Sequence, residues 1–227
     1  MRHNYALVVL VCAIFACGLL AAGCWNPFNP STKDGAGGTV EELKERTSPE
    51  NVLHNFRVIY GSKDNAVLTP EDGHSVAEEY RELFSPDSFR FWFIPADLPE
   101  DLKLIGWWGT NDEVASLDSM LTGKALGAVT DIQLTWNVPP AVPDDRVGTS
   151  HWMHIEVRQI LLDVVQGANT LRVASGTADF YFSRDPRNSN LWVIIEWIDR
   201  QPPSGSPRAM PAADENNSWG KIKGLFH

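Results

Sequence analysis

Imidazole and carboxylate side chains that could do acid–base or metal chemistry gather in two passages of this chain. The first passage is His151-Trp152-Met153-His154-Ile155-Glu156, and the second is the apolar run around Glu196. Both kinds of group exchange protons near neutral pH when their surroundings shift their pKa, and both ligate Zn²⁺. His151, His154 and Glu196 are therefore the candidate catalytic residues.

The two histidines do not form a metal site if their passage is a β-strand. Successive side chains of a strand point to opposite faces of the sheet, so His151 and His154 face away from each other. A zinc site requires three or four ligands that converge on one point. We therefore expect no bound metal and no cofactor.

The polar residues of the expected sheet have both a catalytic and a purely structural interpretation. One face is expected to collect His154, Glu156, Arg158, Asp179, Tyr181 and Glu196. A catalytic carboxylate needs an enclosed apolar place, whereas a solvated sheet face carries weak cross-strand ion pairs. The second interpretation is favoured, because polar residues normally alternate outward. Glu196 is the best catalytic candidate, because Trp192, Ile194 and Ile198 are expected to share its face.

The first 23 residues have the parts of a secretory signal. Arg2 precedes an apolar run from Tyr5 to Leu20, and small residues then lead to Cys24. An uncleaved membrane helix is the alternative, because the run is close to the lower limit of about 17 residues for a spanning helix.

The ending Leu20-Ala21-Ala22-Gly23-Cys24 resembles the lipobox of bacterial lipoproteins. The resemblance implies cleavage after residue 23 and lipidation of the Cys24 sulfur, so that an exported protein is anchored by its lipid in the cell membrane or the outer membrane. Cys12 and Cys17 would leave with the signal peptide. The mature protein then has neither a free thiol nor a disulfide, which excludes cysteine catalysis and thiolate metal sites.

Charge and composition limit the partners of the mature protein. Removal of residues 1–23 takes away Arg2 and no acid, which leaves 18 basic and 29 acidic residues. Nucleic-acid binding needs a basic stripe, and adhesion to an anionic bilayer needs a basic patch. We therefore expect no nucleic-acid partner and a membrane link made by the lipid on Cys24.

Turn-forming residues divide the chain. Residues 24–47 contain two Asn-Pro pairs and several glycines, as a flexible tether does. Residues 48–200 hold the apolar patterns of one domain. Residues 201–227 begin as a loose linker rich in proline and end in a short apolar segment, which we expect to dock onto the domain.

Three segments carry helix-start signals. These are Ser48-Pro49-Glu50, Thr69-Pro70-Glu71-Asp72 and a capping box at Thr110-Asn111-Asp112-Glu113. Each is followed by apolar residues at helical spacing along a single stripe. Each predicted helix should therefore cover a sheet.

Five later passages predict strands, at about residues 89–94, 130–138, 151–165, 170–183 and 191–198. The most coherent register places Val165 opposite Thr170 and Phe182 opposite Leu191. One face is then apolar, made by Ile132, Leu134, Trp136, Met153, Ile155, Val157, Phe180, Phe182, Val193, Ile195 and Trp197. Toward the tip of the first hairpin the apolar residues change face, and Ile160, Leu162, Leu171 and Val173 form the apolar side.

This order of elements resembles the nuclear transport factor 2-like (SnoaL-like) superfamily. The passages that carry the resemblance are Ser48–Leu53, Tyr80–Phe91 and Trp192–Asp199. It implies a cone-shaped α+β fold, with three N-terminal helices packed on a curved antiparallel sheet and a ligand cavity between them. The polar residues expected to line this cavity are His151, Gln159, Tyr60 and Tyr80.

Members of the superfamily include enzymes as well as non-catalytic pocket and dimer modules, so the fold does not choose among them. No catalytic set of the family can be carried over residue by residue to this sequence. We expect a non-catalytic small-ligand-binding or protein-interaction module at the cell envelope. The alternative is a pocket enzyme of isomerase, dehydratase or hydrolase type acting on a small apolar substrate. A homodimer and a small apolar ligand are the partners that these hypotheses leave open.

Overall fold

The protein is described by a computed structural model that covers residues 42–61, 75–98, 104–122, 129–146, 148–149, 151–166, 169–200 and 218–226. The expected signal peptide, Cys24, the tether up to residue 41 and the linker at 201–217 lie outside the described residues. Within the described part, no helix is both long and apolar enough to span a bilayer.

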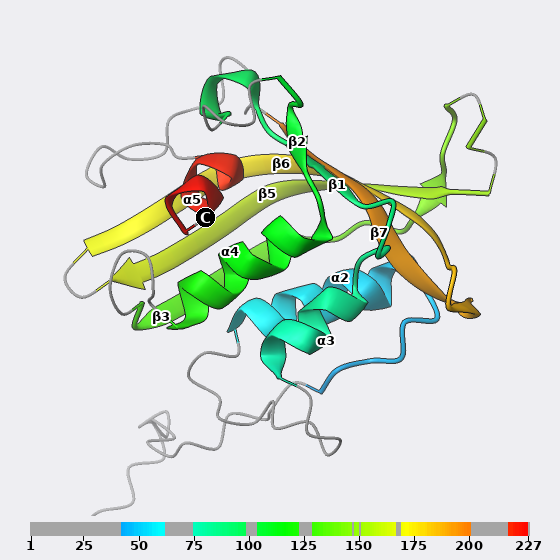
Figure 1. The fold of residues 1–227 in the computed structure, drawn as a ribbon, viewed down its shortest axis with the longest axis horizontal. Coiled ribbons are helices and arrows are strands. Elements are labelled where there is room, and N and C mark those ends of the chain that lie inside the picture. The colour runs from blue at the N-terminus through cyan, green and yellow to red at the C-terminus, as the bar shows by residue number, and fades with distance from the viewer. Residues whose placement is uncertain are drawn as a thin grey trace, which may run out of the picture. The chain divides into compact units, whose positions relative to one another are not determined.

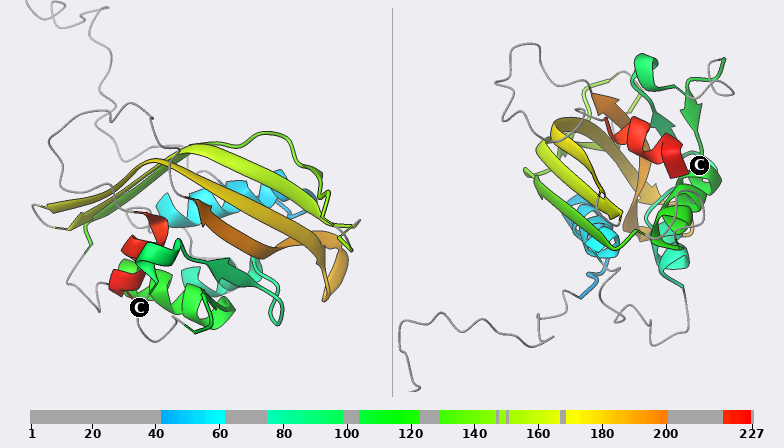
Figure 2. Two further views of the ribbon diagram at one scale, coloured as in Figure 1. Left: turned by 90° about the horizontal axis from the view of Figure 1, so that it is seen from above. Right: turned by 90° about the vertical axis from the view of Figure 1, so that its left-hand side faces the viewer.

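The described elements are four α-helices, a short 3-10 turn and seven strands. The helices are α2 (Pro49–Tyr60), α3 (Val76–Glu82), α4 (Thr110–Thr122) and α5 (Trp219–Phe226), with the 3-10 turn η2 at Pro95–Asp97. The strands are β1 (Arg90–Trp92), β2 (Trp107–Trp108), β3 (Asp131–Asn137), β4 (Val142–Pro143), β5 (Met153–Gln166), β6 (Asn169–Asp185) and β7 (Asn188–Arg200). All seven strands form one sheet in the order β2-β1-β7-β6-β5-β3, and β4 pairs with β5. The sheet is curled, and the helices lie on its concave side (Figures 1 and 2).

The helices differ in position from the expected arrangement. Only α2 and α3 precede the sheet, whereas α4 follows β1 and β2, and α5 ends the described chain. The start of α2 is as predicted, because the Ser48 side chain accepts a hydrogen bond from the Asn51 N–H and Pro49 opens the helix. The described part of α3 begins at Val76, where Ser75 and Glu78 form a reciprocal capping box. The helix start predicted at Thr69-Pro70-Glu71-Asp72 lies outside the described residues.

The sheet is mixed, which corrects the expectation of an antiparallel sheet. The strand β1 runs parallel to β7, with Phe91 opposite Trp197. The parallel pairing starts directly after α3, where the Ser85 N–H donates to the Ile194 carbonyl at 2.9 Å and the Ile194 N–H donates to the Leu83 carbonyl at 2.8 Å. The chain therefore leaves α3 already aligned with β7.

The predicted register of the β5–β6 hairpin is confirmed. Val165 lies opposite Thr170, and Met153 lies opposite Phe182. Between them the ladder is interrupted by a bulge between Val157 and Ile160, where Gln159 has a φ of +58°, and a second irregularity between Ile160 and Leu162 restores the register. An extra residue in one strand turns the following side chains to the other face. The bulge therefore produces the predicted change of apolar face, and Ile160 is buried in the core.

The predicted register of the β6–β7 hairpin is wrong. At the turn, Asp185 pairs with Asn188, but Arg184 then pairs with Trp192, so residues 189–191 are left out of the ladder. The reason is a long-range contact. The Trp192 N–H donates to the Arg46 carbonyl at 2.8 Å, and the Arg46 guanidinium donates to the Trp192 carbonyl at 3.2 Å. The N-terminal segment thus holds the backbone of β7 in a shifted position.

This shift and a second irregularity exchange the faces of several β7 residues. Ile194 and Trp197 lie in the main core, opposite Phe182 and Phe180. Val193 and Ile195, which were expected in that core, lie on the outer face in a small cluster with Tyr181. The main core is strongly aromatic, and its rings include Phe56, Tyr60, Tyr80, Trp108, Phe180, Trp197 and Trp219.

Candidate functional site

The C-terminal helix α5 is packed into the interior, beside α4 and against β6 (Figure 1). Trp219, Ile222 and Phe226 are fully buried, as the apolar spacing of this segment favours. The Gly220 N–H donates to the Asp199 Oδ2 at 2.9 Å. A Cβ on Gly220 would lie 2.8 Å from the Phe93 ring, so the helix backbone approaches that ring as closely as only glycine permits.

A buried ion pair joins α5 to α4. The Lys223 Nζ lies 2.6 Å from Glu113 Oε1 and 2.5 Å from Glu113 Oε2, and neither side chain is exposed. The Tyr80 hydroxyl donates to Oε1 at 2.6 Å, and the Trp108 Nε1–H donates to Oε2 at 3.0 Å. Each carboxylate oxygen thus accepts two hydrogen bonds, which is what a charge this deep requires.

Aromatic rings complete the surroundings of the Lys223 ammonium group. The Nζ atom lies 3.4 Å from the centroid of Trp197 and 4.0 Å from that of Phe91. Ring faces attract cations, and more strongly in a site without water. Burial lowers the pKa of Lys223 to about 8, against the attraction of Glu113. Burial and the neighbouring Glu113 charge keep the pKa of Tyr80 well above its ordinary value, so this phenol remains a donor.

A second interior carboxyl, Asp199, lies at the start of α5. Its side chain is nearly fully buried, and burial raises its pKa to about 7, against the Gly220 N–H and the Lys223 charge. Asp199 is therefore the enclosed carboxyl whose protonation changes near neutral pH.

The sequence candidate His154 lies on the outer face of the sheet. Its Nε2 atom is 2.8 Å from Asp179 Oδ1, and its ring stacks on Tyr181 with centroids 4.6 Å apart. Arg200 also binds Asp179. Although burial opposes it, these hydrogen bonds hold the pKa of Asp179 below its ordinary value. His154 thus belongs to a cross-strand network of the kind that a sheet face carries.

Glu196 also lies on the outer face, bound by two partners. The Arg146 guanidinium donates to it at 2.6 Å and the Trp92 Nε1–H at 2.8 Å. Arg146 reaches Glu196 from the segment after β4 by crossing the Tyr181 ring, with its guanidinium carbon 3.6 Å from the centroid. Of the three apolar residues expected beside Glu196, Trp192 and Ile194 belong to the main core, and Ile198 alone packs on the outer face with the Tyr181 cluster. The apolar enclosure that favoured Glu196 as a catalytic acid is therefore not formed.

The four other polar residues expected at the site, His151, Gln159, Tyr60 and Tyr80, do not join His154 and Glu196 on the outer face. His151 is exposed in the turn before β5, and Gln159 is exposed at the bulge, so neither lines the interior. Tyr60 and Tyr80 do lie in the interior. Among the residues that the structure describes, no three His, Cys, Asp or Glu side chains gather as metal ligands would.

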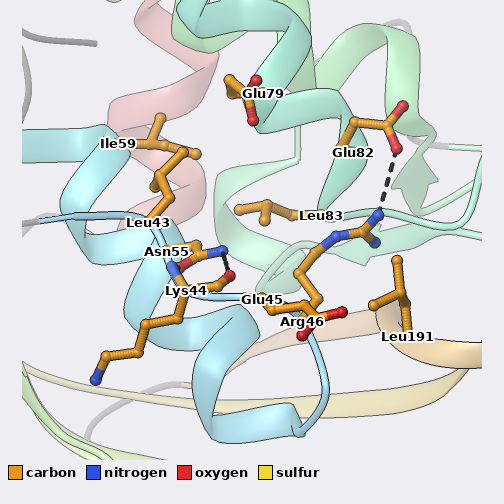
Figure 3. Close-up of a pocket in the computed structure, with 10 residues that line it drawn as sticks. All are labelled: Leu43, Lys44, Glu45, Arg46, Asn55, Ile59, Glu79, Glu82, Leu83 and Leu191. Atoms are coloured by element: carbon orange, nitrogen blue, oxygen red, sulfur yellow. Dashed lines mark hydrogen bonds and ion pairs between the residues drawn. The ribbon is translucent and has the colours of Figure 1, made fainter. Parts of the chain in front are cut away.

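Two of the hollows on the surface of the described residues lie beside Glu196 and Arg46. The larger, of about 500 Å³, lies beside Glu196 and is lined by Asp87, Ser88, Arg90, Arg146, Thr149, Trp152, Ile195 and Glu196. The smaller, of about 200 Å³, lies between the segment at residues 43–46 and the helices α2 and α3 (Figure 3).

At the smaller hollow, Arg46 attaches the N-terminal segment to the domain. Figure 3 shows its guanidinium reaching Glu82, at 3.4 Å. It also binds the buried Asp185 at 3.1 Å. Nearby, Asn55 exchanges two hydrogen bonds of 2.7 Å with the Lys44 backbone. These contacts hold residues 44–46 on the domain.

Sequence reasoning missed the Glu113–Lys223 pair. Glu113 was assigned to a capping box, but its side chain turns inward, and the Gly109 N–H is instead bound by Asp112. One signal was present in the sequence. Glu113 lies on the same helical stripe as Leu117 and Met120, and Lys223 lies on that of Trp219 and Phe226, so each charge interrupts an apolar stripe.

Comparison with known proteins finds similar solved structures but no related sequence. No protein-family model matches this sequence, and no curated protein matches it. Similar solved structures include a protein of unknown function from Mycobacterium tuberculosis, with 9% identity and a TM-score of 0.44, covering 78% of this chain and 88% of that one. Another is a nuclear transport factor 2-like protein with a cystatin-like fold from Novosphingobium aromaticivorans, with 14% identity, a TM-score of 0.41, and coverage of 73% and 86%.

The beta subunit of a benzoate 1,2-dioxygenase from Burkholderia mallei is also similar, with 10% identity and a TM-score of 0.41, covering 67% of this chain and 89% of that subunit. The structural neighbours of this chain thus include proteins with a nuclear transport factor 2-like, cystatin-like fold.

Proposed function

We propose that this chain is an exported, lipid-anchored binding module of the bacterial cell envelope, with a non-catalytic domain of the nuclear transport factor 2-like type. The observation that carries the non-catalytic part is the Glu113–Lys223 pair. The carboxylate faces the interior, where a small ligand would react, but both of its oxygens are occupied by hydrogen bonds from the chain itself. A carboxylate whose two oxygens already bind three side chains of the chain itself has no oxygen left to bind the reacting group of a ligand.

The outer face supports the same proposal. His154 is bound to Asp179, and Glu196 is bound to Arg146 and Trp92. Replacing either candidate is therefore expected to leave ligand or partner binding intact.

Labelling of the full-length chain in a bacterial host with an alkyne analogue of palmitate tests the anchor. The wild-type chain is expected to take up the label and to fractionate with membranes. Cys24→Ser is expected to lose the label, and Cys17→Ser is the matched control, because Cys17 would leave with the signal peptide. Equal labelling of the wild-type and Cys24→Ser chains would contradict the anchor.

Native mass spectrometry of the detergent-extracted full-length chain tests binding. A small molecule that is retained and recovered unchanged after incubation supports a module that binds without turnover. A dimer mass or a second protein mass would identify a protein-interaction module.

One observation favours the alternative, a pocket enzyme of isomerase, dehydratase or hydrolase type. Asp199 is enclosed, and its pKa of about 7 suits a general acid or base. Conversion of a retained compound by the wild-type chain, but not by Asp199→Asn, would establish the enzyme and overturn the non-catalytic proposal.

A further inference from the structure

The surroundings of the Lys223 ammonium group have the composition of a cation receptor. One carboxylate binds the ammonium directly, through Glu113. The Trp197 and Phe91 rings face it at 3.4 and 4.0 Å, and the Trp108 ring lies at 5.8 Å. An aromatic cage with an anion is the usual protein solution for recognising an organic ammonium ion, because the rings and the charge replace its hydration shell.

The domain builds this receptor without help from α5. The carboxylate comes from α4, and the three rings come from β1, β2 and β7. These parts also hold one another. The Phe91 ring packs edge-on against Trp197 at 4.8 Å, and the Trp108 Nε1–H fixes the Glu113 carboxylate. A receptor whose parts are fixed by their own neighbours remains formed when its occupant leaves.

The helix α5, which carries Lys223 into the receptor, is short enough to leave it and return. The helix α5 has only eight residues, and isolated helices shorter than about 12–15 residues are marginal in water, so its helicity depends on docking. With α5 in place, the Trp197 indole N–H is buried and has no hydrogen-bond partner among the described residues.

We propose that Glu113 and the rings of Phe91, Trp108 and Trp197 form a binding site for a primary alkylammonium group carried on an apolar body, and that Lys223 is a resident occupant which such a ligand displaces. The primary amine is specified by Glu113, which accepts two hydrogen bonds from Nζ that a quaternary ammonium cannot donate. The apolar body is specified by the space that Trp219, Ile222 and Phe226 fill. The inference rests on the proposed function in taking the domain to bind its ligand without converting it.

Thermal unfolding of the full-length chain with n-butylammonium chloride tests the proposal. Lys223→Ala removes the resident ammonium, so n-butylammonium is expected to raise its unfolding midpoint in a saturable way. The wild-type chain is expected to need at least a tenfold higher n-butylammonium concentration for the same effect, because Lys223 competes for the site. Lys221→Ala, an exposed lysine on the same helix, is the matched control and is expected to behave as wild type.

Three compounds and one variant test the chemistry of the site. None of n-butanol, potassium chloride and tetramethylammonium chloride is expected to raise the unfolding midpoint as n-butylammonium does. Glu113→Gln in the Lys223→Ala background is expected to abolish the effect of n-butylammonium. The proposal is overturned if n-butylammonium leaves Lys223→Ala unchanged, if n-butanol acts equally, or if the effect survives Glu113→Gln.

A measurement on the wild-type chain needs no substitution. Hydrogen exchange at the Ile222 amide is expected to accelerate as n-butylammonium displaces α5, whereas unchanged exchange at saturating amine would overturn displacement. These results are independent of the Cys24→Ser labelling and of the Asp199→Asn turnover assay, so failure of the amine site is distinguishable from failure of the anchor or of the non-catalytic proposal.

Discussion

Glu113 and Lys223 are 110 residues apart in the sequence, yet the Lys223 Nζ lies 2.6 Å from Glu113 Oε1 and both side chains are fully buried. This contact joins α4 to the C-terminal helix across the interior. A buried pair gains little net stability over apolar residues, because both charges lose their hydration. A single buried charge without its partner is far worse, so the pair specifies where α5 docks.

Removal of one partner is therefore expected to be costly. Lys223→Met leaves the Glu113 charge uncompensated, and the free energy of unfolding should fall by about 3–5 kcal/mol. The double substitution with Glu113→Gln should recover part of this loss, because no net charge is then buried. Urea unfolding of the full-length chains measures both values. A loss below about 1 kcal/mol in the single variant would contradict the requirement of the buried Glu113 charge for Lys223.

Gly220 is expected to be required where α5 crosses Phe93. A Cβ there would lie 2.8 Å from the Phe93 ring, which itself packs edge-on against Trp108 at 4.8 Å. Gly220→Ala should therefore lower the free energy of unfolding by about 1–3 kcal/mol, as overpacking does. Gly224→Ala, at an exposed position of the same helix, is the control and should raise it by up to about 1 kcal/mol through helix propensity. Equal effects at the two positions would contradict the close packing.

The pH dependence of stability should carry the signature of Asp199. Its pKa rises from an ordinary 3.8 to about 7 on folding, so between these values the folded chain binds more protons than the unfolded chain. The contribution of Asp199 is thus full below about pH 4 and is lost as the pH rises through 7. Urea midpoints measured from pH 4 to pH 7 should fall more steeply for the wild-type chain than for Asp199→Asn. Parallel curves would mean that Asp199 is ionised throughout.

Arg46 is expected to stabilise both the attachment of the N-terminal segment and the shifted backbone of β7. Its guanidinium binds the buried Asp185 and the Trp192 carbonyl. Arg46→Ala should cost about 1.5–3 kcal/mol, the range for a hydrogen bond to a charged group. It should also accelerate hydrogen exchange at Trp192. Arg184→Ala is the control, because this exposed arginine stacks on the Trp192 ring and its guanidinium donates to the Asn190 carbonyl at 3.2 Å rather than to the Trp192 carbonyl. Equal exchange at Trp192 in both variants would contradict the role of Arg46.

Where neighbouring residues decide the structure, sequence patterns predicted it. Ser48 and Pro49 placed the start of α2, and Val165 opposite Thr170 placed the whole β5–β6 hairpin. The second hairpin followed the same logic only at its turn, where Asp185 faces Asn188. Beyond the turn, the backbone contact with Arg46 displaced Trp192 by three residues. The alternation of apolar and polar residues within β7 could not predict this contact, because Arg46 lies more than 140 residues before Trp192 in the sequence.

The features of the candidate site also fall into those that sequence patterns predicted and those that depend on distant residues. By itself the sequence determined the helices α2 and α4 and the longer strands, which residues alternate outward on β5 and β6, and that His154 and Glu196 share the polar face, because these follow from propensity and the period of each element. It did not predict the two-residue strands β2 and β4. Only the tertiary structure decided that Glu113 faces the interior instead of capping α4, that β1 lies parallel to β7, and that Lys223 enters an aromatic cage. Each of these depends on a partner from a distant element, and the energy that selects it arises only when burial removes water from both.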